Sequence, residues 1–192
     1  VSIPFYGEFI TARWGYEALA VKQFKDNKYE RQFYPLNKII SNSQYKKVYW
    51  YTEIKKDLDI ISNGLSKGTL DENLMKKLKV VYNEFKKEQI LLPDYKFDQI
   101  EYLSPDKITP AVIVQAKAYV DLLKQVYIAI YNDADSKKQA LLNKFQSENK
   151  ELFFKLRNDY TNSSLEEFVT NKNETTGMIE FNGELVSKKD PI

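Results

Sequence analysis

The chain has 192 residues, 43% of them hydrophobic and 29% charged, which suits one globular domain or one domain with a small appendage. It contains no Cys and no His, which excludes thiol nucleophiles, imidazole acid–base chemistry, Ser-His-Asp triads and nearly all types of zinc site. Its 29 basic and 27 acidic residues alternate along the chain and leave a net charge of +2, so we expect no nucleic-acid partner.

The first element predicted is a short connector followed by a helix. Residues 1–9 are apolar and aromatic and contain Pro4 and Gly7, which is typical of a connector that packs against the fold. Thr11 is placed to cap a helix over residues 12–26. The apolar residues of that helix recur at steps of three and four: Trp14, Ala18, Val21 and Phe24.

Two further helical stretches are expected before residue 64. The first is weak and spans residues 29–40, with Pro35 predicting a break or a restart. Ser43 is the predicted cap of the second, which ends near residue 63. Gly64 then occupies the position just after the helix end, where glycine is favoured.

The middle of the chain carries the clearest helix signals. Thr69 and Glu72 have the spacing of a capping box. Residues 91–110 contain three prolines and predict the longest irregular stretch, after which Thr109 and Pro110 begin a new helix in the favoured way. The helix after the capping box has the most regular apolar stripe: Leu70, Leu74, Leu78, Val81 and Phe85.

The last part of the chain predicts three helices and a hairpin. One helix runs to about residue 132, and another spans residues 136–160. A capping box at Ser164 and Glu167 opens a short third helix, and Asn182-Gly183 between two short apolar runs predicts a β-hairpin. The inward-facing residues expected in the second helix are Leu141, Phe145, Leu152, Leu156 and Tyr160.

These elements predict a mainly α fold, an antiparallel helical bundle of about five to seven helices with a small C-terminal β-hairpin. We expect one compact domain, with the bundle over residues 35–172 and the hairpin and a final connector over residues 173–192. Phosphate-binding, dinucleotide-binding and calcium-binding loop motifs do not occur, so no cofactor and no metal is expected. The most apolar window, residues 111–131, carries three charged residues and predicts a core helix.

Three sets of residues are candidates for chemistry. Glu8 and Glu17 lie in aromatic surroundings and could form a glycosidase-like carboxylate pair, although Glu17 also suits an ion pair with Arg13 one helical turn away. The aromatic run at residues 45–53 could bind a saccharide, but core packing explains it more simply. Two glycosylation sequons, at Asn162 and Asn173, are expected by chance in a chain rich in Asn. We therefore expect no enzyme activity in this chain.

The segment IPFYGEFITARWGYEALAVKQFKDNKYERQFY, residues 3–34, carries a family resemblance. It resembles the extracytoplasmic segment before the last membrane helix in the permease half of G-subfamily ABC transporters, especially relatives of the Bacteroidetes type, in which a large extra domain follows. The cysteines that brace this loop in animal members are missing. The matching residues that imply a membrane-interface motif are Arg13, Trp14, Tyr16, Glu17 and Phe24.

The resemblance implies a non-catalytic extracytoplasmic (periplasmic) domain of a bacterial inner-membrane transporter. Residues 1–34 would then be a membrane-proximal connector and an interfacial helix, since Trp and Tyr favour the membrane–water boundary. The implied partners are the membrane helices and ATPase domain of the same transporter, and a periplasmic protein or substrate. Two alternatives remain open: a free-standing helical protein-interaction module, and a carbohydrate-binding or carbohydrate-acting protein.

Overall fold

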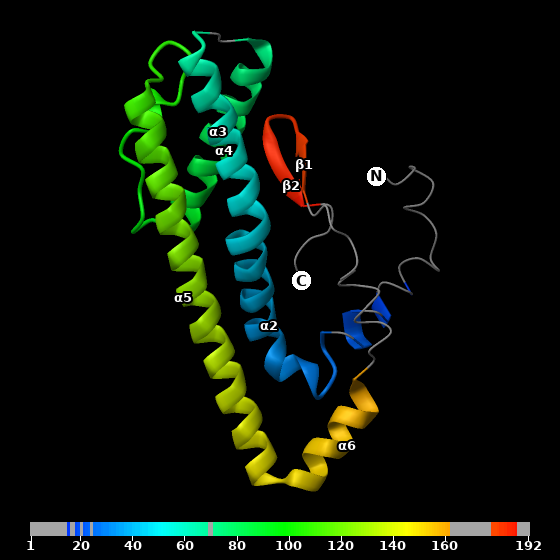
Figure 1. The fold of residues 1–192 in the computed structure, drawn as a ribbon. Helices are drawn as coiled ribbons and strands as arrows, with labels where there is room; N and C mark the ends of the chain where they lie inside the picture. The colour runs from blue at the N-terminus through cyan, green and yellow to red at the C-terminus, as the bar shows by residue number, and fades with distance from the viewer. Residues whose placement is uncertain are drawn as a thin grey trace. The chain divides into compact units, whose positions relative to one another are not determined.

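The computed structural model describes residues 15, 18–19, 21–23, 25–68, 71–161 and 178–187. These residues form a mainly helical fold with a two-stranded antiparallel C-terminal hairpin, which confirms the predicted fold class (Figure 1). The helices are α2 (Glu30–Tyr45), the π-helical turn η2 (Lys46–Trp50), α3 (Tyr51–Ser66), α4 (Glu72–Leu91), the 3-10 turn η3 (Ile100–Tyr102), α5 (Pro110–Glu148) and α6 (Lys150–Tyr160), and the strands are β1 (Met178–Phe181) and β2 (Glu184–Ser187).

The described chain divides into two compact units. The first contains the described residues up to Ile40 and those from Asp133 to Thr161. The second contains Ser41 to Asn132 together with the hairpin. Each unit has its own hydrophobic core.

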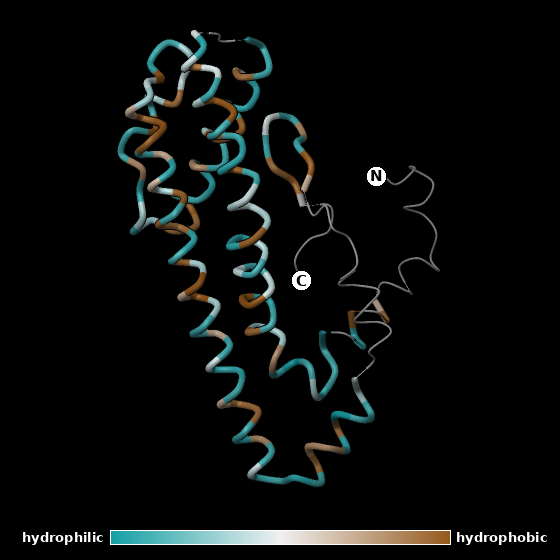
Figure 2. The backbone as a smooth tube through the Cα atoms, in the orientation of Figure 1, coloured by the Kyte–Doolittle hydropathy of each residue, from teal (hydrophilic) through white to brown (hydrophobic). Residues whose placement is uncertain are grey.

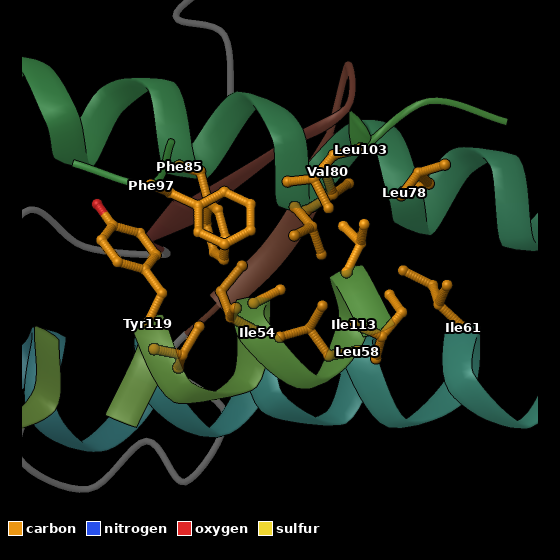
Figure 3. Packing of buried hydrophobic residues seen from close by; sticks show 14 of the residues in the cluster. Ile54, Leu58, Ile61, Leu78, Val80, Phe85, Phe97, Leu103, Ile113 and Tyr119 are labelled. Atoms are coloured by element: carbon orange, nitrogen blue, oxygen red, sulfur yellow. The ribbon is translucent and has the colours of Figure 1, made fainter. Parts of the chain in front are cut away.

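The second unit is built on α3, which runs antiparallel to both α4 and the first half of α5. Contacts in opposite chain order, such as Lys46 with Glu88 and Asp57 with Lys77, show this for α4. The irregular residues 92–109 carry the chain back along α4 before α5 begins (Figure 1). Figure 3 shows the core between these helices, with Phe85, Phe97 and Tyr119 at one end, Ile54, Leu58 and Ile113 in the middle, and Ile61 and Leu78 at the other end.

The first unit has a smaller aromatic core. Tyr29 and Phe33 pack together, and Tyr29 meets Phe153 edge to face with ring centroids 5.9 Å apart. Just before α2, the Asn27 side-chain oxygen accepts hydrogen bonds from the backbone N–H groups of Tyr29 (2.9 Å) and Glu30 (2.7 Å). The partly buried residues around this core are Leu141, Leu142, Phe145, Leu156 and Tyr160.

The helical path from residue 30 to residue 66 differs from the prediction. Pro35 lies inside α2 without breaking it. Because proline lacks an N–H group, one backbone carbonyl of the helix loses its usual hydrogen-bond donor, and the other carbonyls are unaffected by this loss. Ser43 is buried within α2 and caps no new helix, because the chain continues through η2 into α3. The helix ends two residues later than Gly64, and the glycine with positive φ near this helix end is Gly68.

Gly64 instead allows close contact between α3 and α4. A Cβ atom at this position would lie only 3.1 Å from Leu74 Cγ. Leu74 is buried, which leaves little room for its side chain to move. The glycine therefore serves packing in the helix interior rather than termination.

Two further helix boundaries differ from the prediction. The N-cap of α4 is Asp71, whose carboxylate accepts a 2.8 Å hydrogen bond from Leu74 N, whereas the predicted cap Thr69 lies outside the described residues. The predicted break near residues 132–136 is absent, because α5 continues to Glu148. It contains no glycine or further proline there, and Lys137 pairs with Asp133 at 2.7 Å across one turn.

The break comes instead at Asn149, whose side chain accepts from Leu152 N at 2.9 Å and caps α6. Leu152 was expected to face inward, but its side chain is exposed and Phe153 is buried in its place. The start of α5 at Pro110 is as predicted, with Thr109 Oγ1 accepting from Val112 N at 3.3 Å. The short helix predicted after Ser164 lies outside the described residues.

The hairpin follows the prediction. Phe181 pairs with Glu184 across the two-residue turn. Asn182 has φ of 53° and Gly183 has φ of 80°, the left-handed values that a type I′ turn requires at both positions. Leu185 of β2 is buried in the core of the second unit, and Met178 packs against that core.

Candidate functional site

The residues of the predicted membrane-interface motif are not among those that the structure describes. The same holds for Glu8 and for the sequons at Asn162 and Asn173. The neighbouring described residues Ala18, Leu19 and Val21 are helical, as predicted for residues 12–26. Leu19 is 69% exposed and Val21 is 49% exposed, so this helix presents apolar side chains to its surroundings. The undescribed motif residues are Arg13, Trp14, Tyr16, Glu17 and Phe24.

A fully buried carboxylate, Glu88, lies on α4 in the second unit. One of its oxygens forms an ion pair with Lys46, and Oε2 accepts a 2.5 Å hydrogen bond from the Tyr127 hydroxyl. Burial and the nearby charge of Glu88 raise the pKa of Tyr127, so its hydroxyl remains a donor. The Lys46 ammonium also lies 5.0 Å from the centroid of the Trp50 ring.

A second buried carboxylate, Glu84, lies one turn earlier on α4. Its Oε2 accepts from the Trp50 indole N–H at 2.9 Å. Its Oε1 accepts from the backbone N–H of Leu185 in β2 at 3.1 Å and from the Lys87 ammonium at 3.0 Å. Glu84 therefore links η2, α4 and the hairpin.

These two carboxylates stabilise the fold and have no free oxygen for a substrate. Each of the four oxygens already accepts from a donor or pairs with a cation. The π turn η2 supplies both Lys46 and Trp50, one turn apart, to Glu88 and Glu84. This cluster was not predicted from the sequence, although Glu88 falls three residues after Phe85, on the apolar face of its helix, which is an available signal for a buried acid.

A third buried carboxylate, Asp57 of α3, faces the hairpin. Lys77 Nζ lies 3.0 Å from Asp57 Oδ1 and also pairs with Glu180 of β1. Burial raises the pKa of the Asp57 carboxyl, while the Lys77 ammonium opposes that shift. With Lys87 paired to Glu184 at 2.8 Å, two lysines of α4 hold one acid from each strand.

Lysine and tyrosine side chains line the seam that η2 and α3 form with α5. The Lys47 ammonium lies 3.3 Å from the centroid of the Tyr131 ring, and that of Lys124 lies 4.0 Å from the centroid of the Tyr51 ring. Two ion pairs continue the seam: Lys55 with Asp121 at 2.8 Å and Lys117 with Asp59 at 2.6 Å. The aromatic run at residues 45–53 is thus divided between the core, where Trp50 is buried, and this half-exposed seam.

A shallow pocket of about 480 Å³ lies where residues 92–109 meet the start of α5. Lys107 is its one charged lining residue, so it holds no carboxylate pair for acid–base chemistry. The lining residues are Gln99, Tyr102, Lys107, Thr109, Ala111, Val112 and Gln115.

Comparison of the chain with protein-family models, with curated proteins and with solved structures gives no match. Among the described helices, none has the length and hydrophobicity needed to cross a membrane, and polar residues interrupt the apolar ones all along α5 (Figure 2). Within the same described residues, acidic side chains form no cluster of three that could hold a metal ion.

Proposed function

We propose that this chain is a non-catalytic extracytoplasmic domain of a bacterial ABC transporter permease similar to the G subfamily. In this proposal residues 1–34 lie next to the membrane, and the helical units cap the translocation path or dock a periplasmic protein or substrate. The transporter's own membrane helices and ATPase domain would be its permanent partners.

The observation that carries the proposal is the apolar exposure of the helix that follows ARWGYE. Leu19 and Val21 are 69% and 49% exposed, and the other described residues of this segment, Gly15, Ala18, Lys22 and Gln23, are exposed as well. Exposed apolar residues next to Trp and Tyr are typical of a helix that lies in a membrane interface. The occupied oxygens of Glu84 and Glu88 support the non-catalytic part of the proposal.

Binding of the purified chain to vesicles of phosphatidylethanolamine and phosphatidylglycerol tests the proposal. We expect the chain to float with the vesicles and Leu19→Glu to weaken binding by about tenfold or more, since burying a leucine side chain contributes about 1.5–3 kcal/mol. The matched control is Ile90→Glu, because Ile90 on α4 is 79% exposed but lies far along the chain from the proposed interface.

Two results would overturn the membrane-interface assignment. One is a chain that does not float at all. The other is equal loss of binding in Leu19→Glu and Ile90→Glu, because that would indicate unspecific hydrophobic adsorption rather than a defined interfacial helix.

A second candidate function, a helical protein-interaction module, is favoured by a different observation. Ile90 and Leu91 are adjacent at the end of α4 and are 79% and 58% exposed. Such a pair is suited to contact an apolar surface of another protein. If the wild-type chain does not bind the vesicles, the interaction module becomes the favoured function.

A further inference from the structure

The outer edge of β1 carries unpaired backbone groups. In a hairpin with a two-residue turn, Phe181 and Glu184 exchange both hydrogen bonds, and so do Ile179 and Val186. The N–H and C=O of Met178 and Glu180 therefore point away from β2. Among the described residues β1 pairs with β2 alone, and these outward groups make no other backbone hydrogen bond.

The opposite edge of the hairpin is already occupied. The outward N–H of Leu185 in β2 donates to Glu84, and the Asn83 side chain donates to Gly183 O at 2.8 Å. β2 thus lies against α4, and in the part of the chain that the structure describes β1 leaves an edge open.

An apolar stripe on the outer face of the hairpin ends at that open edge. Ile179 and Val186 are cross-strand partners, and their side chains are 46% and 39% exposed. Phe181 follows on the same face of β1 and is 61% exposed. The opposite face of β1 carries Met178 and Glu180, of which Met178 packs against the core and Glu180 pairs with Lys77.

Among the described residues, β1 lacks several of the devices that protect an edge strand, although at four residues it is itself short. β1 contains no lysine, no proline and no bulge, and its single charge is neutralised within the unit by Lys77. We propose that β1 pairs with β1 of a second copy of this chain, so that two hairpins form a four-stranded antiparallel sheet.

One register fits a two-fold axis through this edge. With the axis at Ile179, Met178 lies opposite Glu180 of the second copy, and these two pairs exchange four backbone hydrogen bonds. The acid then faces an uncharged side chain, whereas an axis at Glu180 would place two glutamates directly opposite each other. The two Ile179 side chains meet at the centre, and the apolar stripe continues from Val186 of one copy to Val186 of the other.

Disulfide cross-linking tests this register, because the chain has no native cysteine. Residues directly opposite in a non-hydrogen-bonded pair have Cα atoms about 4.5 Å apart, within the range that a disulfide spans. Ile179→Cys should therefore form a covalent dimer on mild oxidation. The matched control is Val186→Cys on the same face, where three strand spacings would separate the two sulfurs by about 14 Å.

We expect Ile179→Cys to cross-link about tenfold faster than Val186→Cys at equal protein concentration, because only the first pair meets the geometry of a disulfide. A chain that sediments as a monomer, with equal and slow cross-linking of both variants, would overturn the proposal and leave the edge to a strand from another protein. Faster cross-linking of Val186→Cys would also overturn it.

A second pair of variants tests the backbone contribution without cysteine chemistry. Glu180→Pro removes an outward N–H that β2 does not use, and proline is tolerated on an edge strand. Glu180→Ala loses the same ion pair with Lys77 but keeps the N–H. We expect Glu180→Ala to remain dimeric and Glu180→Pro to sediment as a monomer, and equal behaviour of the two variants would contradict backbone pairing through β1.

Discussion

Replacing Glu84 by alanine should remove more stability than any single ion pair on the surface. Its carboxylate accepts from the Trp50 indole and from Leu185 N, both of which are buried. Each donor left without an acceptor costs about 1–3 kcal/mol, and Lys87 can return to solvent. Because the fold also escapes the cost of burying the Glu84 charge, we expect a net loss of about 3 kcal/mol, measured by urea unfolding followed by circular dichroism.

A double-mutant cycle with Trp50→Phe separates the indole bond from the other contacts of Glu84. Phenylalanine removes the donor but keeps an aromatic ring in the core. In that background, Glu84→Ala should cost about 1–2 kcal/mol less than in the wild type. A cost below about 1 kcal/mol for Glu84→Ala alone, or no coupling to Trp50, would refute the assignment of Glu84 as the link between η2, α4 and the hairpin.

Three further substitutions have expected effects on stability. Because burial raises the pKa of Asp57 above its ordinary value of 3.8, the folded chain holds that proton more tightly than the unfolded chain, so stability from this group falls as pH rises. The stability of Asp57→Asn relative to wild type should therefore increase from about pH 4 towards neutral pH, as measured by urea unfolding at several pH values. Asp71→Ala removes the N-cap bond to Leu74 and should lower the unfolding free energy by about 1 kcal/mol in the same assay, whereas Glu72→Ala, at an exposed site, should change it little. Gly183→Ala must adopt positive φ and should weaken the hairpin by about 1–2 kcal/mol, measured by hydrogen exchange of the hairpin amides.

Specific results would contradict these expectations. A stability of Asp57→Asn relative to wild type that falls as pH rises would mean that the ion pair with Lys77 outweighs burial. Equal effects of Asp71→Ala and Glu72→Ala would indicate that the side chain of Asp71 does not cap α4. Unchanged exchange in Gly183→Ala would exclude the left-handed turn.

Local signals predicted the helices and the hairpin where they agree with tertiary contacts. The stripe from Leu74 to Phe85 is buried as expected, because a period near 3.6 leaves one face of α4 apolar. The dipeptide Asn182-Gly183 predicted the hairpin turn, since few other dipeptides place two consecutive residues at positive φ. Ser43 is a good cap in isolation, but the contacts of Lys46 and Trp50 with α4 continue the helix through it.

The buried polar cluster could not be derived from the sequence, because its members are distant along the chain. Lys46 and Glu88 are separated by 42 residues, and Glu84 and Leu185 by 101. Only the packing of α3, α4 and the hairpin brings them together. The local sequence also gives no sign of the division into two units. The boundaries fall inside α2 and α5, and neither helix is interrupted there.

The proposed function requires that this chain adjoin a membrane as part of an ABC transporter. The most direct test is to determine the coding sequence on both sides of these 192 residues. We expect an apolar segment of about 20 residues close to each end, with a nucleotide-binding ATPase cassette upstream. A start codon immediately before Val1 and a stop codon immediately after Ile192 would contradict it.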